Sequence, residues 1–139
     1  MSVVETKEKA TLDGLDRALR CAELAADKKG YAVKVLDIQT ISTIADYLVI
    51  ITGKSEKQNQ AICDHIRREL KKFGKIQDVE GESDGKWIIM DYSDVLVHIF
   101  QEEQRSRYDL DGLWFEAPLV PLAPELEATI RANEASFEI

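Results

Sequence analysis

Two segments of the chain are apolar at nearly every position, and the expected fold is organised around them. Residues 47–52 and 95–100 are each six residues long, which suits a strand and is too short for a buried helix. Successive side chains of a strand point to opposite faces, so an unbroken apolar run needs cover on both faces. The pattern therefore predicts two central strands with helices on either side.

The second of these segments is expected to be half of a β-hairpin. Residues 87–91 form another apolar run, and a four-residue polar corner that starts at Asp91 separates it from 95–100. We expect a type I turn, in which the Asp91 carboxylate accepts hydrogen bonds from the amides of the turn. A primed turn is less favourable, because Tyr92 and Ser93 would both need positive φ. This acidic corner should lie at one end of the sheet.

The remaining elements follow from the spacing of apolar residues and from their flanking residues. Steps of three and four predict amphipathic helices, the first capped by Thr11 and ended by Gly30. The pattern predicts an α/β fold, a mixed sheet of about five strands with helices on both faces. The expected order is helix 11–30, strand 33–38, strand 47–52, helix 55–73, strand 76–80, strand 87–91, strand 95–100 and helix 101–108.

The expected folded domain covers residues 12–115. Residues 1–11 are polar and are expected to form a flexible N-terminus. Residues 116–139 hold five acids, one base and three prolines at period three, which favours an extended conformation. We expect a Pro-containing acidic tail whose proline segment is a linker or a wrapping segment, followed by a short polar helix over about 125–133.

The net charge of −8 limits the expected partners. No segment forms a basic stripe, so direct recognition of nucleic acid is not expected, because such binding depends on neutralising phosphates. An acidic surface is better suited to a basic protein partner. Cys21 and Cys63 match no metal or redox spacing and are expected to be free thiols. No apolar run is long enough to span a membrane and no leader peptide is visible, so a cytoplasmic protein is expected.

Several stretches of the chain together form a recognisable family pattern. They are residues 45–50, 52–55, 60–62, 80–81, 87–91, 94–100 and 108–114, and the last two together are specific. With these residues the chain resembles the Iojap family of ribosomal silencing factors (RsfS) over about residues 15–114. It departs from the family pattern at Arg107 and Gly112, and the segment beyond Ala117 lies outside that pattern.

The resemblance implies a non-enzymatic translation factor without a cofactor. Members of the family bind a large-subunit ribosomal protein, protein fourteen, on the face that meets the small subunit. They thereby block subunit joining and repress translation when nutrients are short. The family fold is related to nucleotidyltransferases but lacks their catalytic residues. From the apolar pattern we expect no membrane association, and the sequence leaves a homodimer open.

Nucleotidyl transfer is the enzymatic alternative. Gly53 and Ser55, at a strand-to-helix turn, offer backbone amides at a helix N-terminus, which suit a phosphate. Either Asp78 and Glu80 or Asp91 and Asp94 could hold Mg²⁺, a cation that prefers oxygen ligands. Ser55 is also explained as a helix cap, Asp78 and Glu80 lie on a weak edge strand, and Asp91 and Asp94 are explained by turn chemistry. We therefore predict no catalytic residues and no metal site.

The predicted contact surface combines aromatic, aliphatic and acidic residues around the hairpin. Tryptophan and tyrosine are common at the energetic centres of protein interfaces, and a corner position should keep a tyrosine from full burial. His98, on a central strand, is expected to be a core residue bonded to backbone or to a carboxylate, Asp46 or Asp94. The predicted partner-binding residues are Trp87, Ile89, Asp91, Tyr92, Asp94, Glu102 and Glu103.

Overall fold

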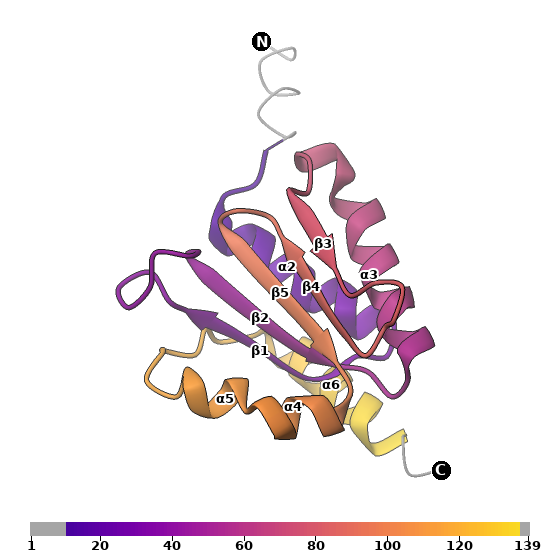
Figure 1. Cartoon of the computed structure of the whole chain (residues 1–139). Helices are drawn as coiled ribbons and strands as arrows, with labels where there is room; N and C mark the ends of the chain where they lie inside the picture. The colour runs from indigo at the N-terminus through magenta and orange to yellow at the C-terminus, as the bar shows by residue number, and fades with distance from the viewer. Residues whose placement is uncertain (1–10, 137–139) are drawn as a thin grey trace.

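A mixed five-stranded sheet lies at the centre of the structure, a computed structural model that describes residues 11–136 (Figure 1). The strand order is β1-β2-β5-β4-β3, with β2 and β5 parallel and all other neighbours antiparallel. The two segments expected to be central are β2 and β5, and neither lies at an edge, which confirms the prediction. The strands are β1 (Tyr31–Asp37), β2 (Tyr47–Thr52), β3 (Asp78–Glu80), β4 (Trp87–Asp91) and β5 (Val95–Phe100).

The helices divide unequally between the two faces of the sheet (Figure 1). Three of them cover one face: α2 (Gly14–Asp27), α3 (Glu56–Leu70), which continues into the 3₁₀ turn η1 (Lys71–Phe73), and α6 (Pro124–Ala135). Only two short helices lie on the other face, α4 (Glu102–Tyr108) and α5 (Leu110–Leu113). The expected α/β class, with helices on both faces, is confirmed, but the cover on the second face is partial.

The face under α2, α3 and α6, called the covered face below, holds the main core. Its strand side chains interlock with Leu24, Ile62, Ile66 and other helix residues that have almost no exposed surface. Close packing of this kind supplies most of the hydrophobic stabilisation of a domain. The strand residues that face this core are Val33, Val35, Val49, Ile51, Ile88, Met90, Val95, Val97 and Ile99.

The β4–β5 hairpin turns one residue later than the sequence predicted. The amide of Tyr92 donates to the carbonyl of Val95 (2.9 Å), so Ser93 and Asp94 form the loop and Ser93 takes a φ of 79°. The Asp91 carboxylate accepts a bond from the Ser93 amide (2.7 Å), as expected. Tyr92 therefore follows β4 directly, and its amide closes the loop instead of lying at the tip of the corner.

The ends of the first helix also differ from the prediction. Asp13, not Thr11, caps α2 by accepting a bond from the Asp16 amide (2.8 Å). Lys29, not Gly30, takes the left-handed conformation at the end, with a φ of 71°. A glycine is still required at position 30, because a Cβ there would lie 2.8 Å from a backbone carbonyl of α2.

The segment after α5 packs against the domain. Leu119 forms an isolated antiparallel bridge with Leu36, so the proline segment runs along the outer edge of β1. The Asn133 side chain in α6 donates to the carbonyls of Ala26 (3.1 Å) and Gly30 (2.9 Å) at the end of α2. The wrapping segment and the helix expected there are thus both present, and packing continues past residue 115.

The N-terminal segment expected to be flexible lies almost entirely outside the described residues. Of the segment 1–11, for which flexibility was predicted, the structure describes only Thr11. Within residues 11–136, none of the helices has the length and apolar character needed to cross a membrane.

Candidate functional site

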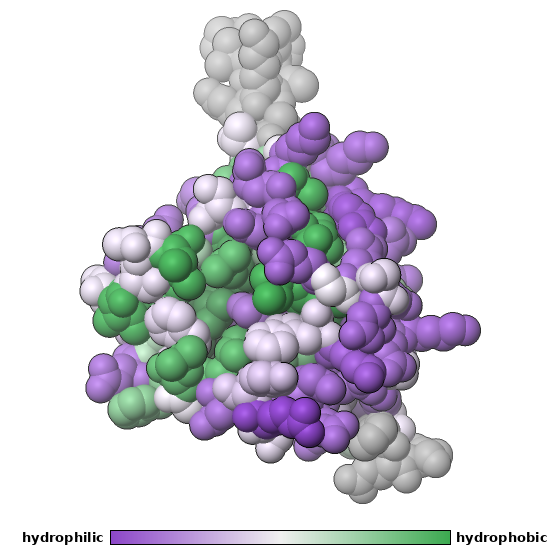
Figure 2. Space-filling model, in the orientation of Figure 1, coloured by the Kyte–Doolittle hydropathy of each residue, from purple (hydrophilic) through white to green (hydrophobic). Residues whose placement is uncertain are grey.

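The sheet surface that α4 and α5 leave uncovered exposes apolar side chains. Trp87 and Ile89 of β4 and Leu96 and His98 of β5 are half-buried there, and we call these four residues the open face. Figure 2 shows hydrophobic side chains gathered on this side of the molecule, over β2 and β5 and to their left. The elements that border the open face carry further exposed apolar residues: Ile41, Ile44, Tyr108, Leu113 and Phe115.

Strand periodicity and short helices explain why this face stays open. Side chains alternate along β4 and β5, so the neighbours of the four open-face residues point into the covered-face core. On the open side, Leu110 joins a small second core with strand residues such as Leu36 and Leu48. Trp114 of the segment after α5, and Trp87 and Leu96 of the open face, pack against this core and stay only partly buried. A contiguous apolar surface left without cover is typical of an interaction site.

The open face is organised by a hydrogen bond between two of its own rings. The Trp87 indole Nε1–H donates to Nδ1 of His98 (3.0 Å), and the ring centroids are 5.9 Å apart. Trp87 also contacts Phe100 (5.4 Å between centroids) and Tyr108 (4.7 Å). Burial lowers the pKa of His98 to about 4, so its imidazole is neutral near pH 7.

The predicted carboxylate partners of His98 were wrong. His98 of β5 pairs with Ile89 of β4, so their side chains lie on the same face of the sheet. Trp87 is two residues before Ile89 on β4 and therefore shares that face. Asp94 is instead bonded to Arg17, and the backbone amide of Asp46 donates to the Asp94 carbonyl. Sequence reasoning missed the indole donor, although register in the predicted hairpin could have suggested it.

Tyr92 is buried, contrary to the expectation that a corner position would keep it exposed. It is 6% exposed and lies in the covered-face core, with the Arg17 guanidinium 5.5 Å from its ring centroid. Burial raises the pKa of its hydroxyl. The prediction of an exposed tyrosine failed because the turn begins one residue later, so Tyr92 directly follows β4 and its side chain packs into the core with α2 and α3.

The two aspartates of the corner have different surroundings. The Asp94 carboxylate accepts a hydrogen bond from Nε of Arg17 in α2 (3.1 Å), so it points toward the covered side of the sheet. Asp91 is half-buried and follows Trp87 and Ile89 at alternate positions of β4, which places it on the open side. Only Asp91 of this pair therefore borders the open face.

Glu102 and Glu103 lie in the first turn of α4, just beyond the end of β5, and both are exposed. Acidic residues are favourable there because the N-terminus of a helix carries partial positive charge. The Tyr31 hydroxyl donates to Glu102 (3.3 Å), which holds that carboxylate toward the start of β1. Asp91 and these two glutamates thus lie toward opposite ends of β5.

A buried arginine fixes the two short helices, and sequence reasoning did not single it out. Arg105 donates from Nε and Nη2 to the Asp111 carboxylate (both 2.9 Å) and from Nη1 to Ala32 O (2.5 Å) and Thr52 Oγ1 (2.8 Å). Lys34 also pairs with Asp111 (2.9 Å). These bonds hold the pKa of the Asp111 carboxyl well below its usual range and join α4 and α5 to β1 and β2.

The residues of the enzymatic alternative lie at opposite ends of the sheet. Thr52 pairs with Phe100, so Gly53 and Ser55 follow one end of β5, whereas Asp91 pairs near its other end. At about 3.3 Å per residue, the two groups are separated by most of a strand, roughly 15 Å. The Ser55 hydroxyl caps α3 by accepting from an amide (3.1 Å). Residues 11–136 contain no group of three or more metal-ligating side chains.

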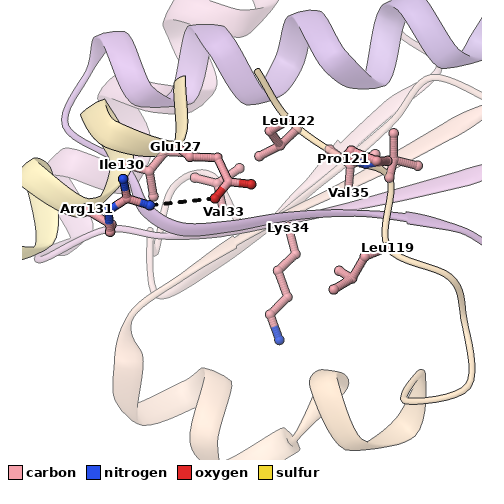
Figure 3. Close-up of a pocket in the computed structure, with 10 residues that line it drawn as sticks. Val33, Lys34, Val35, Leu119, Pro121, Leu122, Glu127, Ile130 and Arg131 are labelled. Atoms are coloured by element: carbon pink, nitrogen blue, oxygen red, sulfur yellow. Dashed lines mark ion pairs between the residues drawn. The ribbon is translucent and has the colours of Figure 1, made fainter. Parts of the chain in front are cut away.

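A mostly aliphatic cavity lies beside β1, away from the open face (Figure 3). It lies between the strand, the wrapping segment and α6, and aliphatic side chains such as Val35, Leu122 and Ile130 form much of its lining. Its one carboxylate, Glu127, is paired with Arg131 (3.7 Å), and the Lys34 side chain points away from it (Figure 3). The lining residues do not form an arrangement suited to catalysis.

Comparison with known proteins gives a consistent result. The family model described as "Ribosomal silencing factor during starvation" matches residues 11–138. Ribosomal silencing factor RsfS of Bacillus subtilis is 39% identical over 97 residues, which cover 69% of this chain and 82% of that protein. RsfS of Haemophilus influenzae is 34% identical over 105 residues (75% and 90%). Chloroplastic protein Iojap of Arabidopsis thaliana is 31% identical over 113 residues (79% and 46%).

Two solved structures share the fold of this chain. A Chromobacterium violaceum protein matches with a TM-score of 0.72 at 28% identity, covering 75% of this chain and 88% of its own. A Bacillus halodurans protein matches with a TM-score of 0.62 at 36% identity (75% and 96%). The family match reaches residue 138, so the prediction that the segment beyond Ala117 lies outside the family pattern was wrong. This chain belongs to the RsfS family of ribosomal silencing factors.

Proposed function

We propose that this protein uses its open face to bind a large-subunit ribosomal protein, protein fourteen, and thereby blocks joining of the small subunit. Translation is then repressed when nutrients are short. The family assignment supports a ribosome-associated role in silencing. The observation that carries the proposed surface is the uncovered apolar half of the sheet, where Trp87, Ile89 and Leu96 remain partly accessible.

The chemistry of this surface suits a basic protein partner. Apolar and aromatic atoms at the centre would be desolvated on binding, and charged groups at the rim would set orientation and association rate. Asp91 lies at one end of β5, and Glu102 and Glu103 lie at the other. Tyr92 and Asp94 are omitted from the proposed surface, because the structure turns both toward the covered side.

Inhibition in this proposal is steric and reversible. The protein occupies space that the small subunit needs, and the extent of inhibition depends on its concentration relative to its affinity for the large subunit. No cofactor, metal or nucleic-acid readout takes part. The nucleotidyltransferase alternative would need a joint site, which the separation of Gly53 and Ser55 from Asp91 and Asp94 does not offer.

A subunit-joining assay tests both the activity and the surface. Separated ribosomal subunits are mixed with the protein and resolved on a sucrose gradient, and wild type should shift joined ribosomes to free subunits. Ile44→Asp places a charge on a residue that is 57% exposed, so folding should be retained. If Ile44 or Trp87 is an interface hot spot, Ile44→Asp or Trp87→Ala should weaken binding by about 2 kcal/mol, which is roughly thirtyfold.

The matched control is Leu15→Asp. Leu15 is 38% exposed, but it belongs to α2 on the covered side, so its substitution introduces the same chemistry away from the proposed surface. If saturating wild type leaves joining unchanged, silencing by steric block is wrong for this protein. If wild type blocks joining and both surface variants block it equally well, the activity stands and the open face is the wrong surface.

A further inference from the structure

The middle of the open face contains one polar side chain among apolar ones. His98 lies on β5, the central strand, with Ile50 and Ile89 as its register partners on the two neighbouring strands. Phe100, two residues along the same strand, is fully buried, and its ring centroid is 6.3 Å from that of His98. Any partner that covers this face must therefore accommodate the imidazole.

The indole of Trp87 determines which imidazole nitrogen carries the proton. An indole N–H can only donate, so Nδ1 of His98, 3.0 Å away, must be an unprotonated acceptor. A protonated imidazolium would present N–H groups at both nitrogens and would lose this bond. Burial also disfavours the charged form by lowering the pKa of His98 to about 4. The single proton of the neutral ring is thus on Nε2.

Among residues 11–136, the Nε2–H group has no hydrogen-bond partner, and the one bond of the His98 side chain is at Nδ1. In the free protein, water can satisfy this donor. On docking, the donor would be buried, and a buried donor without an acceptor costs about five- to 150-fold in affinity. A partner that binds tightly should therefore bring an acceptor to this position.

The acceptor should be uncharged. A carboxylate would be desolvated among Ile50, Ile89 and Leu96, which is costly without a positive partner. It would also approach a chain of net charge −8, with Asp91 at the border of the face. A carbonyl oxygen has the same acceptor geometry without these penalties.

We propose that His98 is a specificity-determining residue of the open face, whose Nε2–H donates to a neutral carbonyl oxygen of the protein partner. Trp87 is then a positioning residue, which holds the ring in the required tautomer. The inference rests on the proposed function and adds the chemistry that the partner must present. By this inference, His98 favours a partner that brings an uncharged carbonyl oxygen to its Nε2–H group over a partner that brings a carboxylate there.

The test measures affinity of the full chain for isolated large subunits, alongside urea unfolding of each variant. His98→Leu removes the donor and leaves the partner's carbonyl unpaired, so binding should weaken about tenfold or more. His98→Gln retains an N–H donor and should recover part of that loss. Leu15→Met, a volume-conserving change on α2 and away from the open face, should bind as tightly as wild type.

Nitrogen-15 NMR of the free protein reads the tautomer directly. Wild type should show an unprotonated Nδ1 and a protonated Nε2 at neutral pH. Trp87→Phe, which removes the donor to Nδ1 and keeps an aromatic ring, should show a mixture of tautomers. These spectra test the tautomer alone. A purely structural role for His98 would change stability without recovery of binding by glutamine.

The outcomes separate the inference from the proposed function. If wild type does not bind large subunits, the proposed function fails and the inference fails with it. If wild type binds and His98→Leu binds equally tightly, or if the proton is found on Nδ1, only the inference is overturned. Weak binding by His98→Leu with partial recovery by His98→Gln supports it.

Discussion

The two faces of one sheet are built from similar residues and have different surroundings. Along β4, Ile88 has no exposed surface in the covered-face core, while its neighbour Ile89 is half-buried on the open face. Both are isoleucines in the same strand, so the difference lies in what packs above them. Helices α2, α3 and α6 cover one face, whereas α4 and α5 are only seven and four residues long.

This comparison shows how the fold separates stability from recognition. Apolar area on the covered face is removed from water during folding and stabilises the domain. Equivalent area on the open face stays partly hydrated and can contribute free energy to association instead. Polar groups follow the same division: Asn133 is bonded to two backbone carbonyls on the covered side, while Nε2 of His98 has no partner in the described structure.

The largest expected effect comes from truncating the two neighbouring isoleucines. Ile88→Ala should lower the free energy of unfolding by about 2–5 kcal/mol, because it leaves a cavity in a closely packed core. Ile89→Ala should cost about 1 kcal/mol or less, because its site is already partly open, but it should weaken binding to large subunits. Urea unfolding and subunit pelleting measure the two effects. Equal destabilisation by both variants would refute the distinction between the faces.

A smaller effect is expected from loosening the partial cover of the open face. Arg105→Ala removes the bonds that join α4 and α5 to β1 and leaves Asp111 without its arginine. Because Asp111 is 29% exposed and still pairs with Lys34, we expect a loss of about 2–3 kcal/mol, below the full cost of breaking a buried pair. Hydrogen exchange should accelerate over residues 102–113.

Arg107→Ala is the control for this change, because Arg107 is an exposed residue of the same helix. It should alter stability by less than about 0.5 kcal/mol. Unchanged exchange over residues 102–113 in Arg105→Ala would mean that apolar contacts alone hold the two short helices in place.

Acidification should distinguish the faces through His98. Its pKa is about 6.5 in an unfolded chain and about 4 in the fold, so between these values the unfolded state binds more protons. The stability linked to the neutral ring is therefore complete above pH 6.5 and is lost as pH falls toward 4. Allowing for partial solvent screening, we expect wild type to lose about 1–2 kcal/mol more than His98→Leu across this window.

Urea unfolding at pH 7, 5.5 and 4.5 measures the difference between these two proteins, and carboxylates common to both cancel in it. Parallel pH profiles would mean that the imidazole is not held in its neutral form by the fold.

Apolar patterning was sufficient to predict the sheet, but it could not show which face would remain open. The unbroken apolar runs in β2 and β5 require cover on both sides, and the sequence does not specify whether a helix or another protein supplies it. The deciding feature is that α4 is short and is held toward the β1 edge by Arg105. Its bonds to Ala32 and Thr52 span 73 and 53 positions of the sequence, and local periodicity cannot reveal contacts over such separations.

Some of the predicted contact residues could be placed from local periodicity, and others depended on the position of the turn. Trp87, Ile89 and Asp91 share a face because strand periodicity is two, and that part of the prediction depends only on β4 being a strand. The exposure of Tyr92 was wrongly predicted because the turn is shifted by one residue, which puts Tyr92 directly after β4 with its side chain on the opposite face from Asp91. The indole–imidazole bond depends on the register between β4 and β5, which the same shift determines.

The smallest expected effect tests the charge at the border of the open face. Asp91→Asn keeps an oxygen that can accept the Ser93 amide bond, so the turn should be retained and stability should change by less than about 0.5 kcal/mol. The variant lacks one negative charge, so association with a basic partner should slow by a few-fold at low salt. This difference should vanish at high ionic strength, where the screening length falls to about 3 Å near 1 M salt.

Stopped-flow association and dissociation rates for large subunits, at two salt concentrations, measure this contribution. Glu69→Gln is the matched control, because Glu69 is an exposed carboxylate on α3, on the covered side. If Asp91 acts by steering, only its association rate changes, and the control matches wild type in both rates. A faster dissociation of Asp91→Asn that persists at high salt would instead place Asp91 in direct contact with the partner, inside the buried surface rather than at its rim. If both variants slow association equally, net charge rather than the open face directs the encounter.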